Sequence, residues 1–278
     1  MTVLVFTILL LLGAYAAGLL GSLTGLGGGV VLIPLLTLVF SVDIHYAIGA
    51  ALVASIATSS GSAVAYVRDG IANIRVGMFL EIATTSGAVL GAFLAIYTPT
   101  NIVAITFGAV LIFSALMSFR KKVPHMETSG SPLANKLRLN GTYPVDGNEV
   151  AYSVKNVMGG FGIMSIAGIL SGLLGIGSGA LKVLAMDVAM HLPFKVSTTT
   201  SNFMIGVTAA ASAVVYFQRG YIEPGIALPV VLGVLGGALT GARVLVKANT
   251  NSLRTLFGIV ILFLAAQMIY NGFNGKFK

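Results

Sequence analysis

The chain has 278 residues, of which 56% are hydrophobic and only 9% are charged. Soluble domains carry about 25% charged residues, so this composition excludes an ordinary water-soluble fold. Cysteine is absent, which excludes disulfides, thiol catalysis and thiolate metal sites. The formal net charge is +8, but the basic residues lie in short loops between apolar runs, as membrane topology requires. We therefore expect no nucleic-acid partner.

The first half of the chain predicts five helical segments. In chain order they span roughly residues 3–22, 27–41, 44–67, 74–97 and 101–119. The last three are long enough to cross a hydrocarbon core about 30 Å thick, which takes about 20 residues. The first segment ends in small residues, as a signal peptide does, but it lacks a basic start. Because it also has a counterpart later in the chain, we interpret it as a retained helix.

A polar stretch, residues 121–152, predicts a linker between a first unit, 1–120, and a second unit, 153–278. The second unit again contains five apolar segments, at roughly 155–174, 179–190, 195–217, 224–246 and 252–273. The sequence therefore predicts an all-α polytopic membrane protein whose short second segments are parted from the first by glycine.

The two units are similar to each other in sequence. When the sequence is shifted by 150 residues, no gap is needed from residue 18 to residue 113. Low-complexity apolar sequence gives chance matches, but one ungapped register with shared glycines is hard to obtain by chance. Such a register predicts a two-fold internal repeat. The matched pairs include Gly25 with Gly175, Gly27 with Gly177, Gly29 with Gly179, Gly70 with Gly220 and Gly87 with Gly237.

The number of crossings predicts that the second repeat is inverted. The first two segments return the chain to its starting side, whether they span as a hairpin or re-enter, and three further crossings leave it on the opposite side. With the N-terminus outside, twelve of the sixteen Lys and Arg residues fall on the cytoplasmic side, as the positive-inside rule requires. We therefore expect both termini outside and the 121–152 linker in the cytoplasm.

Each repeat has a glycine-rich break, at residues 25–29 and 175–179. Irregular backbone at membrane depth is tolerated only where it faces protein or a water-filled cavity, and paired breaks in inverted repeats indicate a midplane site. A helix starts after each break, and its free N–H groups attract anions. The alternative is close helix packing through small residues, which we favour for the isolated Gly87 and Gly91. The candidate substrate-binding residues at the breaks are Gly25, Gly27, Gly28, Gly29, Gly175, Gly177, Ser178 and Gly179.

A polar run in the second unit adds Thr200, Ser201 and Asn202 as candidate donors to an anion; the alternative is bonding to carbonyls of their own helix. Lys182 follows the second break and is a further candidate, because a charge at the bilayer centre is usually functional or paired. It could pair loosely with Asp187, or its head group could reach the interface.

Few other residues suggest chemistry. Glu81 could relay a proton, but we favour pairing with Arg75. His45 and His191 lie at segment ends and are interpreted as interfacial rather than as metal ligands. No HExxH, P-loop or catalytic triad spacing is present. We therefore expect no enzyme activity, no catalytic residue, no metal and no cofactor.

The motifs at the breaks resemble those of the TauE/SafE sulfite-exporter family of integral membrane proteins. The resemblance rests on GSLTGLGGG at 21–29 with Pro34, HYAIG at 45–49, GLLGIGSG at 172–179 and TSNF at 200–203. It implies a bacterial-type inner-membrane transporter of small anions, often sulfur-containing ones. The chain departs from its own first repeat at Ser178, where Gly28 stands, and at Lys182, where Leu32 stands.

The leading hypothesis is thus a multi-pass secondary transporter of small anions such as sulfite or organosulfonates, working by alternating access. An anion channel with the breaks as a fixed filter is the alternative from another class, and a non-transporting membrane scaffold is a third. The expected partners are a small anionic substrate and the lipid bilayer. The sequence predicts no particular oligomeric state.

Overall fold

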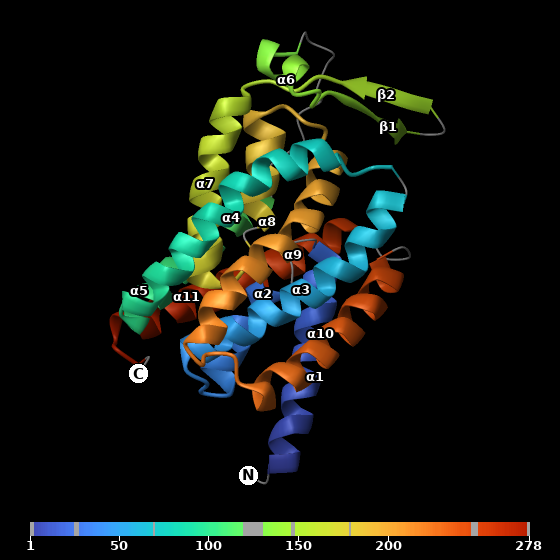
Figure 1. The fold of residues 1–278 in the computed structure, drawn as a ribbon. Coiled ribbons are helices and arrows are strands. Elements are labelled where there is room, and N and C mark those ends of the chain that lie inside the picture. The colour runs from blue at the N-terminus through green and yellow to red at the C-terminus, as the bar shows by residue number, and fades with distance from the viewer. Residues whose placement is uncertain are drawn as a thin grey trace.

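The computed structural model describes residues 3–24, 28–68, 70–118, 130–145, 148–177, 179–245 and 250–276. Helices dominate, and every apolar segment expected from the sequence is helical where it is described (Figure 1). The first half contains α1 (Val3–Thr24), α2 (Gly29–Pro34), the π-helical turn η1 (Leu35–Val39), α3 (Ile44–Arg68), α4 (Ile74–Tyr97) and α5 (Thr100–Ser118). The second half contains α7 (Val157–Leu174), α8 (Gly179–Leu184), η2 (Ala185–Ala189), α9 (Phe194–Gln218), α10 (Pro224–Leu245) and α11 (Thr250–Phe273).

The short segment after each break has the same build in both halves. A helix of 6 residues passes into a π-helical turn of 5 residues, first as α2 and η1 and then as α8 and η2. The chain then leaves through a residue in the left-handed region, Ser41 with φ of 52° and His191 with φ of 59°. These elements lie 150 residues apart, so the sequence register holds for the local backbone as well.

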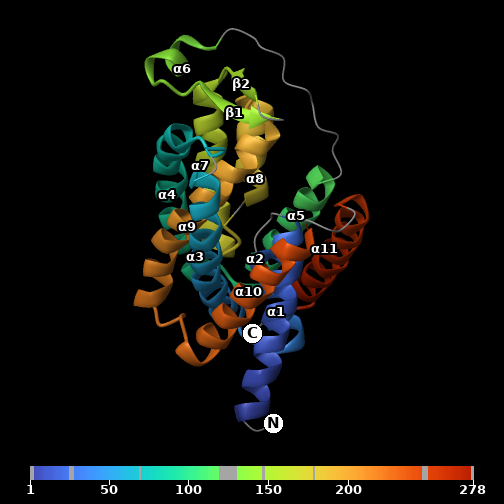
Figure 2. The same ribbon diagram turned by 90° about the vertical axis from the view of Figure 1, so that its right-hand side faces the viewer.

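Four helix pairs hold the molecule together. Helix α1 packs against α10, α4 against α7, α3 against α9, and α5 against α11 (Figure 2). Glycine lets the α4–α7 pair approach closely: a Cβ added at Gly87 would lie 2.4 Å from the Ser165 carbonyl oxygen, and one at Gly91 would lie 2.0 Å from that of Ile169. The packing interpretation of these two glycines is therefore confirmed.

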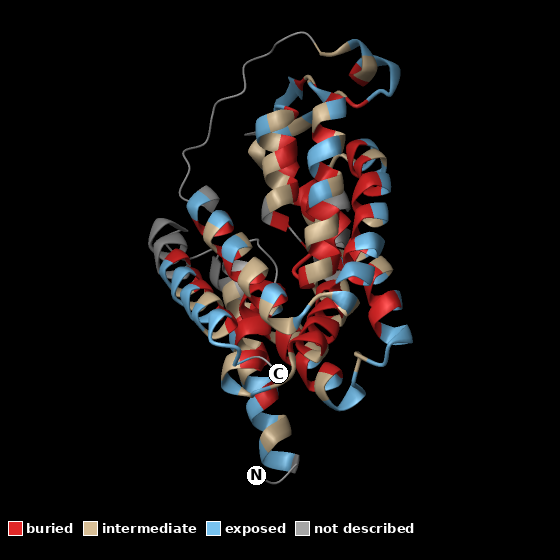
Figure 3. Cartoon of the chain, turned by 90° about the vertical axis from the view of Figure 1, so that its left-hand side faces the viewer, coloured by how far each residue is buried: buried red, intermediate tan, exposed pale blue. Residues whose placement is uncertain are grey.

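Apolar side chains fill the helix junctions and also cover the outside. Buried residues gather where helices meet (Figure 3), while Ile82, Leu232 and Phe263 are 66%, 63% and 60% exposed. Water would disfavour so much exposed apolar surface, and lipid would not. Within the described residues, three helices are long and apolar enough to cross a membrane, namely Ile74–Tyr97, Val157–Leu174 and Phe194–Gln218.

The linker is more ordered than the sequence analysis expected. It contains the short helix α6 (Pro132–Lys136) and an antiparallel hairpin of β1 (Gly141–Val145) and β2 (Asn148–Tyr152), a small departure from the all-α class. The Asp146-Gly147 pair between two β-prone runs is the signal that predicts such a hairpin.

The linker also docks on the helix ends, through Asn73 just before α4. The Asn73 amide donates to the Leu139 carbonyl at 2.8 Å and to the Tyr152 hydroxyl at 2.7 Å. Burial raises the pKa of that hydroxyl, outweighing the hydrogen bond from Asn73. The linker and these helix ends therefore form one packed end of the molecule.

Candidate substrate site at the two helix breaks

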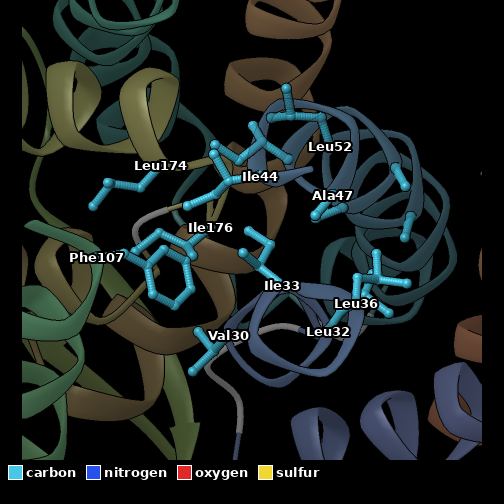
Figure 4. Close-up of a cluster of buried hydrophobic side chains, with 14 of the residues drawn as sticks. Val30, Leu32, Ile33, Leu36, Ile44, Ala47, Leu52, Phe107, Leu174 and Ile176 are labelled. Atoms are coloured by element: carbon cyan, nitrogen blue, oxygen red, sulfur yellow. The ribbon is translucent and has the colours of Figure 1, made fainter. Parts of the chain in front are cut away.

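The two breaks, 150 residues apart in sequence, meet in space. A Cβ added at Gly29, the first residue of α2, would lie 3.3 Å from the Gly175 carbonyl oxygen and 3.6 Å from Ile176 Cα. It would also lie 3.6 Å from the Ser55 hydroxyl on α3. Val30, Ile33 and Ile176, which follow the glycines of the two breaks in sequence, share one apolar cluster (Figure 4). The start of α2 therefore lies directly against the break of the second half.

The second break turns through two glycines in the left-handed region. Gly175 has φ of 68° and caps α7, with its N–H donating to the Ser171 carbonyl at 2.8 Å, and Gly177 has φ of 65°. Side chains are strained at such φ values, which accounts for glycine at both positions. Gly179 then begins α8. Of the predicted break residues, Gly25, Gly27 and Ser178 lie outside the described residues.

The predicted polar run on α9 bonds mainly to neighbouring backbone. The Thr200 hydroxyl accepts from the Asn73 N–H at 3.0 Å, and the Ser201 hydroxyl donates to the Gly179 carbonyl at 3.2 Å. The carbonyl of Asn202 accepts from the Ser59 hydroxyl at 2.5 Å. Thr200 and Ser201 thus link α9 to the starts of α4 and α8, and the run positions the elements that surround the second break.

The most concentrated charge inside the described bundle is a set that we call the charged triplet: Lys182, Thr208 and Glu81. Lys182 is fully buried, and its ammonium donates to the Thr208 hydroxyl at 2.5 Å. That hydroxyl donates to Glu81 Oε1 at 2.6 Å, and Thr85 donates to the same oxygen at 2.9 Å. The triplet joins α8, α9 and α4 just beyond the second break.

These contacts correct two expectations about the charges. Glu81 does not pair with Arg75; the Arg75 guanidinium donates to the Arg138 carbonyl at 3.4 Å instead. Lys182 does not reach the interface, because its ammonium is fully buried and donates to Thr208, with Glu81 as a nearby opposite charge. Glu81 and Thr208 are the site residues that the sequence analysis missed. Glu81 could have been found, since it is the only acidic residue in the long predicted spans.

His45 belongs to a second polar cluster, at the start of α3. Its ring is buried, with Nδ1 3.3 Å from Asp43 Oδ1, Nε2 3.2 Å from the Ala95 carbonyl, and a stacked contact on Tyr221. Burial alone would raise the pKa of Asp43, but hydrogen bonds from His45 outweigh it and lower that pKa. No group of three His, Cys, Asp or Glu side chains suited to a metal occurs among the described residues.

The chain is similar to known proteins along nearly its whole length. The profile of the family described as "Sulfite exporter TauE/SafE" matches residues 10–268. The probable membrane transporter protein YunE of Bacillus subtilis is 30% identical over 276 residues, which cover 96% of this chain and 98% of that protein. The probable membrane transporter protein YdhB of the same organism is 24% identical, covering 92% of this chain and 100% of that protein. A probable membrane transporter protein of Methanocaldococcus jannaschii is 24% identical, covering 92% and 94%. No solved structure matches the chain.

Proposed function

Because the chain belongs to the TauE/SafE sulfite-exporter family of membrane transporters, we propose that it is a secondary transporter of small sulfur-containing anions, such as sulfite or organosulfonates. It works by alternating access as a multi-pass protein of the inner membrane. The observation that carries this proposal is the meeting of the two breaks, with Gly29 against Gly175 and Ile176. Helices that start at one point in the bilayer leave their first N–H groups without partners in the helix, and transporters use such groups to hold substrate.

The arrangement of the helices supports two inverted repeats. In the 150-residue register α1 corresponds to α7 and α4 to α10, and the packed pairs α1–α10 and α4–α7 exchange under it. Helix α1 leads up from the N-terminus at the bottom of Figure 1, whereas α7 leads down from the linker at the top. Pairs that exchange in this way allow one repeat to rock against the other about the shared breaks.

The groups around the breaks suit an anion. Gly29 brings backbone close to the Ser55 hydroxyl in the first half, while the neighbouring Gly28 lies against Val234 of α10. In the second half, the start of α8 at Gly179 is followed by the buried cation of Lys182. Small oxyanions accept hydrogen bonds from donors of these kinds, namely backbone N–H groups, hydroxyls and an ammonium. Together with Gly25, Gly27, Gly177, Ser178 and the Thr200–Asn202 run, these residues make up the proposed site.

We propose the orientation that the basic residues favour, with both termini outside and the 121–152 linker in the cytoplasm. The two ends of the chain lie in the lower half of Figure 1, and the described linker elements α6, β1 and β2 lie at its top, which supports opposite sides for the termini and the linker. The natural absence of cysteine permits a direct test. A cysteine introduced at Gly130 should react with an impermeant maleimide only after the cells are opened. Labelling of that cysteine on intact cells would overturn the topology.

Flux through purified protein in liposomes tests the function. We expect saturable, gradient-driven movement of sulfite or an organosulfonate, in preference to sulfate, thiosulfate and carboxylates. Flux that is far faster, unsaturated and driven by voltage would instead support an anion channel. Liposomes that pass none of these anions would support the non-transporting scaffold.

A single methyl group tests whether the breaks hold the anion. Gly29→Ala adds a Cβ 3.3 Å from the Gly175 carbonyl oxygen, between the two breaks. We expect it to weaken anion binding while the protein still folds. Gly162→Ala is the matched control, because a Cβ at that position on α7 meets nothing within 4 Å. Equal binding by the folded Gly29→Ala variant and the control would remove the breaks from the site.

A further inference from the structure

The charged triplet is isolated from the other ionisable groups of the described bundle. Helix α7, which packs on α4, carries no charged residue. The charged residue of α9, Lys195, is exposed at the start of that helix. Asp187 is the other charged residue of the α8–η2 segment, and it is partly exposed in η2. On α4 itself, Arg75 is exposed and bonded to the linker. Lys182 is therefore the charge that Glu81 meets.

The two oxygens of the Glu81 carboxylate have unequal surroundings. Oε1 accepts from Thr208 and Thr85, whereas Oε2 is buried and has no hydrogen-bond partner among the described residues. An ionised carboxylate can accept about four hydrogen bonds, and a buried acceptor that lacks them is costly. A proton on Oε2 would remove the charge while Oε1 kept its two donors. The geometry thus favours a carboxylate that changes its protonation state during the working cycle.

We propose that Glu81 is the proton carrier that couples anion movement to proton movement. The carboxylate and the transported anion compete for the same donors, the ammonium of Lys182 and the hydroxyl of Thr208. An anion can take this place only when Glu81 is protonated, because two negative charges on one ammonium repel each other. The inference rests on the proposed function and adds its energy source, the proton gradient.

The cycle balances in charge. On one side of the membrane Glu81 Oε2 takes a proton from hydronium, and the neutral acid releases Lys182 to a monovalent anion. The site then holds Lys182 as a cation, the neutral acid and the anion, so its net charge is zero, as it was before. On the other side the anion leaves, Glu81 returns its proton to water and the carboxylate again pairs with Lys182 through Thr208. One proton and one monovalent anion cross together, without net charge transfer.

Methanesulfonate is a suitable probe, because it stays ionised and carries no proton of its own in the relevant pH range. Wild-type protein in liposomes that contain a pH dye should bring in one proton for each radiolabelled methanesulfonate, independent of a clamped membrane potential. In detergent, the apparent Kd for methanesulfonate should rise with pH, by up to about tenfold for each pH unit, since one bound proton is linked to binding. The Glu81→Gln variant should still transport or exchange radiolabelled methanesulfonate, but with few protons for each anion. Its Kd for methanesulfonate should not vary with pH.

Thr84→Val is the matched control. Thr84 is a buried hydroxyl on the same helix that bonds only the Leu80 and Glu81 carbonyls, each at 3.3 Å, so this variant should keep the proton ratio and the pH slope. If Glu81→Gln does not fold, the proton-to-anion ratio of the wild-type protein and the pH dependence of its Kd still test the coupling. Label movement without protons, or a wild-type Kd that is flat with pH, would overturn the coupling and leave the transporter standing. Absence of flux for methanesulfonate and for every other anion of the panel would overturn both proposals.

Discussion

The two halves of the molecule differ in charge at one set of equivalent positions of the repeat. In the 150-residue register the charged triplet is matched by Leu32, Thr58 and Val231, which we call the apolar triplet. Leu32 is fully buried in the larger core cluster, and Val231 packs against the same cluster. The Thr58 hydroxyl donates to the Ala54 carbonyl of its own helix at 3.0 Å. The same architecture thus holds two charges bridged by a hydroxyl in one half and no charge at the equivalent positions of the other.

This difference separates what the fold needs from what the function needs. If the junction required a charge pair for packing, both halves would carry one. Leucine and valine fill the equivalent place without burying a charge, which is the less costly solution in a membrane. The fold by itself does not call for the charged triplet, as its proposed role in anion and proton handling requires, and substitutions that move charge between the two triplets can test that proposal.

The largest effect should come from placing a charge in the apolar triplet. Leu32→Lys buries an ammonium without an acid, and we expect a loss of about 3–5 kcal/mol, the usual cost of an uncompensated buried charge. Adding Val231→Glu should recover part of that loss, because Thr58 is the repeat equivalent of Thr208 and could bridge the two charges in the same way. Denaturation in sodium dodecyl sulfate, followed by circular dichroism, measures both variants. If the Leu32→Lys variant alone is as stable as the wild type, water must reach the apolar triplet and hydrate the new ammonium.

Removing the cation from the charged triplet should have a smaller effect on stability and a clear one on binding. Lys182→Met leaves Glu81 without its cation and should cost about 3 kcal/mol, the lower end of the same range, because Thr208 and Thr85 still donate to the carboxylate. Anion affinity should fall at least about tenfold, or 1.4 kcal/mol. Isothermal titration at two pH values measures both the affinity and its proton dependence. Lys182→Arg keeps the charge and should bind better than Lys182→Met; equal binding by the two variants would exclude contact with substrate.

Copying the apolar triplet into the second half should restore stability without restoring function. The double variant Lys182→Leu with Glu81→Val removes both charges, and such replacements in other proteins are often neutral or stabilising by about 1–4 kcal/mol. We expect folded protein with a melting temperature near or above that of the wild type and no coupled transport. A double variant that fails to fold would show that the two bridged charges are part of the architecture.

Sequence reasoning reached the helices and the breaks because both are local signals. Long apolar runs fix the helices, and the glycines at 175–179 predict a backbone that only glycine adopts readily, as the left-handed Gly175 and Gly177 have. Positions 150 residues apart also have the same backbone conformation in the π-helical turns η1 and η2.

The partners of the charges were beyond sequence reasoning because they depend on contacts between distant helices. Glu81 and Thr208 are 127 residues apart in sequence and meet only when α4 packs on α9. Arg75 was the expected partner of Glu81 because it is close in sequence, but it points to the linker, whose own fold was not expected. Hydroxyl runs such as Thr200–Asn202 were ambiguous for the same reason: their partners, Asn73 and Gly179, lie on other elements.

The smallest effects should separate the bridging hydroxyl from the charges that it joins. Thr208→Ser keeps the oxygen and loses one methyl group, which should cost about 1 kcal/mol at a buried site and leave the proton-to-anion ratio unchanged. Thr208→Val keeps the shape and removes the hydroxyl, so Lys182 and Glu81 Oε1 each lose a partner. It should lower the ratio and weaken anion binding as well as stability, and the liposome assay with methanesulfonate compares the two variants directly. Thr58 in the apolar triplet is also a threonine, yet no charge stands on either side of it, so the hydroxyl by itself makes no site. Unaltered coupling in a folded Thr208→Val variant would mean that Lys182 and Glu81 interact directly during the cycle, with Thr208 serving only to fill space.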